Sequence, residues 1–227
     1  MFVRGGGIRR GVLGATAAVA LLAGAVGCGE DEKSRAEEAW EQSVPPTELC
    51  GGTAVSARAG KALELITGSS RFEASGRTST VADAAQDLSD QFTSSFTGHG
   101  DVCRIFTPVV VPDVVRLEIT WRMSGSAPDG GPGSRYTELD MGELAGTAQD
   151  RAFVTFACRS EELSGVAPAH VDTDVNFGAV STEPTGDVEA LKDAYATVAH
   201  SFALAMAKEL GCENDGGLES RPTLDAA

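Results

Sequence analysis

A long amphipathic segment near the C-terminus constrains the fold more than any other feature of the chain. Between Asp187 and Leu210, apolar residues recur at steps of three and four, the period of one helix face. These positions are Val188, Leu191, Tyr195, Val198, Phe202, Met206 and Leu210. Acidic residues open the segment and Lys208 and Gly211 close it, as the helix dipole and C-cap preferences require. The Ala-rich flanks of this stripe permit close packing against a sheet.

The middle of the chain has the pattern of β-strands. Residues 114–123 alternate apolar and polar side chains, which is typical of a half-buried antiparallel strand. Further strands are predicted at 151–158 and 170–177, with shorter ones at 102–106 and 135–141, and helices at 53–68 and 80–96. The Gly/Pro/Ser-rich run 124–134 is predicted to be a mobile hairpin loop. This order predicts an α+β domain in which helices, including the long C-terminal one, cover one face of an antiparallel sheet.

The N-terminus has the pattern of an export signal. Residues 1–10 contain three arginines and no acid, and residues 11–27 contain no charge. A basic segment followed by a short apolar run is typical of a secretory signal, and the run is shorter than the roughly 20 residues of a membrane span. Arg9 and Arg10 leave two export routes open, the general secretory pathway and the twin-arginine pathway.

The apolar run ends in Ala25, Val26, Gly27 and Cys28. This stretch resembles the lipobox of bacterial lipoproteins, although that family prefers Leu where Ala25 stands. The resemblance implies that Cys28 receives a diacylglyceryl group and becomes the first residue of the mature chain. The alternative is an ordinary secretory signal cleaved nearby. Residues 28–49 are polar and acidic, and we expect them to form a tether, parts of which could be helical.

The other four cysteines are Cys50, Cys103, Cys158 and Cys212. An even number in an exported chain predicts two disulfide bonds, and none lies in a C-x-x-C pair. The number of cysteines alone allows three disulfide connectivities. We favour 50–103 and 158–212, because each of these would join a predicted helix to the sheet that it covers. The folded domain is therefore expected at 50–212, followed by a flexible tail at 213–227.

The complete pattern, a lipobox, a tether, a Cys-Gly-Gly before a helix and later cysteines on strands, resembles small surface lipoproteins of high-GC Gram-positive bacteria. Only the lipobox is a specific motif. The resemblance implies a lipid-anchored position on the extracytoplasmic face of the cell membrane. It supplies no catalytic residues.

The net charge excludes some partners. Without residues 1–27 the chain carries 15 basic and 33 acidic side chains, a formal charge of −18. Nucleic-acid binding needs a basic surface, so nucleic acid is not an expected partner. Electrostatic binding to anionic lipid is disfavoured as well, so membrane attachment has to come from the acyl chains. A protein partner in the cell envelope is a further expectation.

The sequence contains few candidate metal-binding or catalytic residues. Asp172, Asp174, Asn176 and Glu183 occupy places 1, 3, 5 and 12 of a calcium-binding loop, but Phe177 stands where such a loop needs Gly. The polar face of a β-strand explains the same period of two without a metal, and no cofactor is indicated. His99, His170 and His200 have no ligand-spaced neighbour, and His200 is expected on the solvated side of its helix.

We therefore expect a non-enzymatic binding or interaction module of unknown ligand. Two alternatives remain: a surface hydrolase built from scattered acids and one histidine, and a structural protein of the envelope. A concave pocket in which acids converge on His99 or His170 would favour the enzyme.

Overall fold

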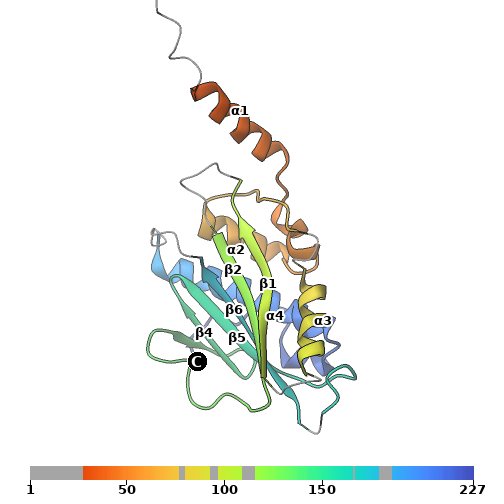
Figure 1. The fold of residues 1–227 in the computed structure, drawn as a ribbon. Helices are drawn as coiled ribbons and strands as arrows, with labels where there is room; N and C mark the ends of the chain where they lie inside the picture. The colour runs from red at the N-terminus through yellow and green to blue at the C-terminus, as the bar shows by residue number, and fades with distance from the viewer. Residues whose placement is uncertain (1–27, 77–79, 93–96, 109–115, 166, 179–185) are drawn as a thin grey trace, which may run out of the picture.

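The structure of the chain, a computed structural model, has a six-stranded antiparallel sheet at its centre (Figure 1). It describes residues 28–76, 80–92, 97–108, 116–165, 167–178 and 186–227. The helices are α1 (Cys28–Glu41), η1 (Pro46–Gly51), α2 (Ala57–Thr67), α3 (Val81–Phe92), α4 (Val188–Glu209) and η2 (Glu213–Gly217). The strands are β1 (Thr97–Phe106), β2 (Arg116–Ser124), β3 (Thr137–Leu139), β4 (Leu144–Ala148), β5 (Arg151–Cys158) and β6 (Ala169–Phe177). The predicted α+β class is confirmed.

The strand order, β1-β2-β6-β5-β4-β3, departs from the chain order at one place. After β2 the chain crosses to the far edge of the sheet, and β3 to β6 then return as hairpins until β6 pairs with β2. This crossing spans four strand spacings, about 19 Å. Residues 125–136 make this crossing. They include most of the run 124–134 that is predicted to be a hairpin loop, but they connect two strands that are not neighbours.

The helices cover one face of the sheet (Figure 1). α4 packs on β4, β5 and β6, α3 packs on β1, and α2 packs on α4. The inward side chains are fully buried and large, including Trp121 and Phe156 from the sheet and Tyr195 and Phe202 from α4. Burying side chains of this size contributes about 1.5–3 kcal/mol each. The apolar stripe predicted for α4 is therefore buried from Leu191 to Leu210, whereas its first residue, Val188, is exposed.

Two disulfide bonds join the helical layer to the strands. Cys50 in η1 pairs with Cys103 in β1, and Cys158 at the end of β5 pairs with Cys212 just after α4. This is the connectivity that the order of the elements favoured. Each bond spans more than 50 residues of sequence. On the chain-entropy model, closing a loop of that length contributes about 4 kcal/mol by restricting the unfolded chain.

Both ends of the domain reach further than expected. On the N-terminal side, Val44 forms a β-bridge with Phe72, and Leu49 is buried. Among the helices that the structure describes, α1 alone therefore lies outside the packed layers (Figure 1). On the C-terminal side, Leu218 is buried and Ala226 bridges Leu139 in β3. We assign residues 213–227 to the folded domain and not to a flexible tail.

Several sequence-based expectations fall on residues that the structure does not describe. These are the export signal 1–27, the last four residues of the helix expected at 80–96, and the first two residues of the strand expected at 114–123. Among the described helices, none combines the length and the apolar character needed to cross a membrane.

The prediction that His200 is solvated is wrong. His200 lies on the side of α4 away from the apolar stripe, but it is only 3% exposed. A backbone group of Glu219, in the C-terminal segment, forms a hydrogen bond with the ring. Burial lowers the pKa of His200 below its ordinary value, and the hydrogen bond with Glu219 offsets only part of this effect.

This burial predicts a loss of stability in mild acid. The unfolded chain takes up a proton on His200 as the pH falls through about 6.5, whereas the folded protein does so only at a lower pH. The free energy of unfolding should therefore fall in that window, by at most about 1.4 kcal/mol per pH unit for one proton. Urea unfolding of the wild type and H200Q between pH 7.5 and 5.5 measures it. H99Q, at an exposed histidine, is the control and should keep the wild-type slope. An unchanged slope in H200Q would contradict this account.

Candidate functional site: a groove on the open face of the sheet

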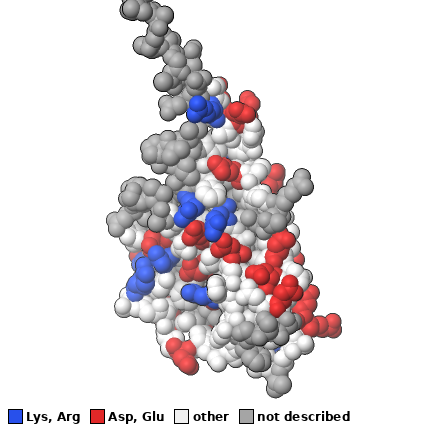
Figure 2. Space-filling model, viewed as in Figure 1, with Lys and Arg blue, Asp and Glu red and all other residues white. Residues whose placement is uncertain are grey.

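The face of the sheet opposite α4 carries the polar side chains of every long strand. Alternation along β2 buries Leu117, Ile119 and Trp121 against the helices and leaves the residues between them on the other face. Figure 2 shows Lys, Arg, Asp and Glu side chains intermixed over this face. Because no described helix covers it, we call it the open face.

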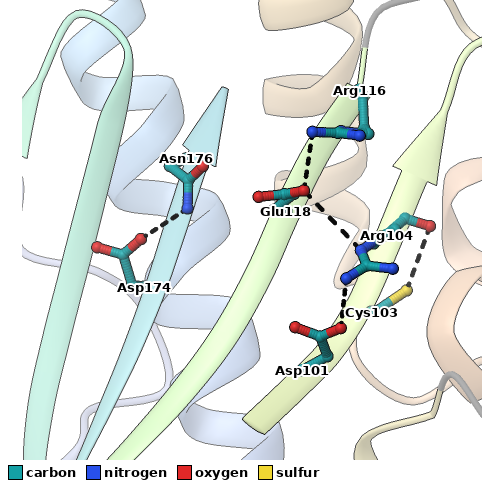
Figure 3. Close-up of polar contacts among 7 residues, drawn as sticks. All are labelled: Asp101, Cys103, Arg104, Arg116, Glu118, Asp174 and Asn176. Carbon is teal, nitrogen blue, oxygen red and sulfur yellow. Dashed lines mark hydrogen bonds and ion pairs between the residues drawn. The ribbon is translucent and has the colours of Figure 1, made fainter. Parts of the chain in front are cut away.

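At the end of the sheet near Phe106, the charges of the open face satisfy one another (Figure 3). Arg104 donates to Asp101 over 2.6 Å, Arg116 lies 2.9 Å from Glu118, and Arg104 lies 3.9 Å from the same Glu118. Asn176 donates to Asp174 over 3.0 Å. The side chains of the ion pairs are between 30 and 58% exposed, so each pair contributes little stability. The charged side chains in this part of the open face are therefore paired with one another and exposed to solvent.

At the other end of the sheet, the open face is hollowed into a groove of about 1010 Å³. We call it the His170 groove. Its lining comes from β1, β2, β4, β5, β6, the end of α3 and the crossing segment: Gln91, Thr97, Gly98, His99, Arg122, Met123, Ser124, Ser126, Ala127, Pro128, Asp129, Pro132, Tyr136, Leu144, Phe153, Thr155, His170 and Asp172. The crossing from β2 to β3 has to pass over this end of the sheet, so the topology itself supplies one wall.

One histidine of the lining, His170, is paired with a carboxylate from the turn before β4. His170 Nδ1 lies 2.5 Å from Glu143 Oε2, with the two side chains 9% and 28% exposed. Glu143 sits in the tight turn before β4, where Gly142 adopts φ +60° and the Glu143 N–H donates to the Thr155 carbonyl over 2.7 Å. That conformation favours glycine, so the turn and the position of Glu143 depend on Gly142.

A second pair lies beside it. Arg122 on β2 donates through Nε and Nη2 to Asp172 Oδ2 on β6, at 3.1 and 2.6 Å, and the Thr155 hydroxyl lies 3.5 Å from Asp172 Oδ1. Burial nevertheless raises the pKa of Asp172 above its ordinary value, against the effect of Arg122. A carboxylate whose pKa is raised by burial inside a concave site is a common mark of a functional position.

The third polar residue, His99, is held through its backbone. Its N–H donates to Gln91 Oε1 over 3.3 Å, and its carbonyl accepts from Gln91 Nε2 over 3.2 Å. α3 can approach this closely because Gly98 and Gly100 have no side chain: a Cβ on Gly98 would lie 2.8 Å from Gln91 Oε1, and a Cβ on Gly100 would lie 2.8 Å from Asp87 Oδ2. The imidazole of His99 stays exposed at the edge of the groove.

The remaining wall is apolar. Tyr136 and Phe153 meet edge to face with ring centroids 5.1 Å apart, and Leu144, Pro128 and Pro132 extend this surface. The groove thus combines a polar floor with an aromatic wall. Sites that bind small molecules commonly have this composition and volumes of roughly 300–1,000 Å³.

The residues of the calcium hypothesis do not converge. Asp172, Asp174 and Asn176 lie along one face of the extended strand β6, so the first and last are about 13 Å apart. A calcium loop would have to curl these residues around one ion. Asp172 pairs with Arg122 instead, and Glu183 lies outside the described residues. In the part of the chain that the structure describes, no group of three or more His, Cys, Asp or Glu side chains could hold a metal.

From the sequence, His99 and His170 are the histidines around which converging acids would favour an enzyme. The fold brings both to one groove, and Glu143 and Asp172 lie near His170. Glu143, Arg122 and Thr155 were not predicted from the sequence. Glu143 is separated from His170 by 27 residues, and only the pairing of β4, β5 and β6 brings them together. Cys28 begins α1, and the four domain cysteines lie in the two disulfides away from the groove.

Comparison with models of known families, with curated proteins and with solved structures finds no match to this chain.

The role of Gly142 gives a direct test of how the site is built. In G142A, the new Cβ would collide with the Thr155 carbonyl oxygen, and the residue would also keep a positive φ. We expect a loss of about 1–3 kcal/mol in urea unfolding, and a displaced His170 ring resonance in NMR spectra. G130A is the matched control, because Gly130 also has a positive φ but a Cβ there meets nothing within 4 Å. Equal losses in the two variants would refute the proposed constraint.

Proposed function

We propose that this chain is a lipid-anchored extracytoplasmic protein that acts by binding a small ligand, or a short segment of a polymer, in the His170 groove. The observation that carries the proposal is the groove itself, of about 1010 Å³. Its lining includes His170, which Glu143 holds through Nδ1, the pair Arg122–Asp172, and the rings of Tyr136 and Phe153. Polar groups fixed by such pairs can orient a ligand, and the rings supply apolar contact area.

Two other hollows in the described part of the chain are weaker candidates. One, of about 700 Å³, lies between residues 159–167 and the end of α4, where Glu161, Glu162 and Glu209 gather without an aromatic side chain. The other, of about 300 Å³, lies beside Cys103 and Arg104. The first has no aromatic side chain in its lining, and the second, although Asp101, Arg104 and Phe106 line it, has less than a third of the volume of the His170 groove.

The position of α1 supports an anchored arrangement. The chain enters the domain through the bridge between Val44 and Phe72, and the next residue, Glu73, donates its N–H to the Phe106 carbonyl at one end of β1. The groove lies at the other end of β1, near Thr97. A strand of this length spans about 33 Å, so a lipid on Cys28 would leave the groove far from the attached end. Two acyl chains bind a bilayer stably, whereas one binds marginally.

The anchor is tested at Cys28. Expressed in a bacterium that processes lipoproteins, the wild-type chain should partition into the detergent phase of Triton X-114, and mass spectrometry should find a diacylglyceryl group on an N-terminal Cys28. C28A should move to the aqueous phase, because no acyl acceptor remains. An unmodified N-terminus at any other residue of the wild type would contradict the proposal.

The groove is tested by thermal shift with defined probes: N-acetylglucosamine oligomers, tri-alanine and short-chain fatty acids. Binding to the folded state at one hundred times Kd stabilises it by about 2.7 kcal/mol, so at least one probe should raise the Tm of the wild type. R122Q and Y136A should lose the shift. R104Q, which removes a charge from the same face outside the groove, should retain it. A shift that survives in R122Q and Y136A would place the ligand elsewhere, and no shift with any probe would count against the proposal.

A further inference from the structure

We propose that the His170 groove also carries a hydrolytic centre, in which Ser124 is the nucleophile, His170 the general base and Glu143 the residue that positions the imidazole. The substrate class is an acyl ester or amide short enough to enter the groove. The inference rests on the proposed function, since it uses the same groove, but it adds a reaction to binding.

The sheet register brings the first two groups together. Ser124, the last residue of β2, is paired directly with His170 on β6. Directly opposed residues of an antiparallel pair point to the same face with Cβ atoms about 4.5–5.5 Å apart. Both residues line the groove. A serine hydroxyl and an imidazole at this separation can meet through a rotation of the serine side chain.

The third group sets the orientation of the ring. The contact of 2.5 Å between Glu143 Oε2 and His170 Nδ1 leaves the other ring nitrogen, Nε2, as the atom available for proton transfer. In serine hydrolases of unrelated folds, a carboxylate on Nδ1 holds the imidazole in the tautomer whose Nε2 accepts the serine proton. Side chains supply this arrangement here from β2, β6 and the turn before β4.

The hydroxyl of Thr155, which also lines the groove, contacts a different side chain and is not the nucleophile. Thr155 is buried and its hydroxyl contacts Asp172. Ser124 Oγ accepts a hydrogen bond from the backbone N–H of Ser126 over 3.1 Å, which holds the oxygen at the rim and leaves its own proton to donate. No hydrogen bond joins Ser124 to His170 in the described structure, and catalytic hydrogen bonds are often longer before substrate binds.

The reaction balances with water as the only co-reactant. Ser124 Oγ forms a bond to the acyl carbon while its proton passes to His170 Nε2, and the negative charge develops on the carbonyl oxygen. That proton then moves to the leaving alcohol or amine as its bond to the acyl carbon breaks. Water next attacks the acyl-serine and gives one proton to His170. His170 returns this proton to Ser124 Oγ as the bond between Oγ and the acyl carbon breaks, so the acid and the free serine are released.

Arg122 is the cation placed to stabilise the developing oxyanion. It precedes Ser124 by two residues on the same face of β2, about 7 Å along the strand. Its side chain is 63% exposed, and it keeps N–H groups beyond the two that Asp172 accepts. A preorganised donor at this position is the feature that commonly lowers the barrier most.

A fluorophosphonate probe tests the nucleophile on the full folded domain, because it phosphonylates a serine only where that serine is activated. Tandem mass spectrometry should locate the modification on Ser124 of the wild type. S124A should lose at least 100-fold in p-nitrophenyl butyrate hydrolysis and all labelling. S134A, at an exposed serine of the same crossing segment outside the groove, should behave as the wild type.

Two further outcomes separate this inference from a structural role and from the binding proposal. E143Q should lower the hydrolysis rate at least tenfold and change its pH profile, while its unfolding midpoint stays near wild type; an unchanged profile would overturn the positioning role. A wild type that shows a ligand-induced thermal shift but neither labelling at Ser124 nor esterase activity would overturn the hydrolytic centre and leave the binding site intact.

Discussion

The burial of α4 against one face of a six-stranded sheet is the interaction on which the rest of this structure depends. Nearly every residue from Ala194 to Ala207 of α4 is buried, and the inward side chains of β5 and β6 are buried beneath it. Polar contacts fix the helix laterally: the Thr147 hydroxyl of β4 donates to the Lys192 carbonyl, and the Ser201 hydroxyl donates to the Ala54 carbonyl. Because the apolar side chains of the sheet are buried against the helices on this face, the side chains on the other face can be polar.

The strand order explains why the two ends of the open face differ, with paired charges at one end and a groove at the other. Where the strands end near Phe106, the charges of neighbouring strands pair with one another and stay solvated. Where β2 ends, the chain must cross four strand spacings to reach β3, and the segment 125–136 walls off a groove above β6 and β5. The groove is therefore a consequence of the strand order, and its chemistry depends on the residues that alternation turns outward there.

Periodicity alone predicted the elements that pack strongly. The bounds of β5 and of α4 agree with the expectation to within a residue or two, because their apolar patterns are long and regular. β4 was missed, since Leu144–Ala148 is small and buried and has no alternation to read. His200 was misjudged because the segment that contains Glu219, whose backbone forms a hydrogen bond with the ring, follows no helical or strand period. Only part of the site could be predicted from the sequence. His170 is one of three histidines and was therefore noticed, whereas Glu143 and Ser124 are brought next to it only by the pairing of strands that are distant in sequence.

The central claim is that ligands of this protein occupy the groove on the open face and no other hollow. A fragment screen followed by two-dimensional NMR of the ¹⁵N-labelled domain tests it most directly, because amide shifts report the location of weak binding without any assumed activity. The account predicts that the fragments that bind shift the amides of Arg122, Thr155 and His170 together. Shifts that cluster instead around Glu161, Leu163 and Gly211, in the hollow at the end of α4, would contradict it.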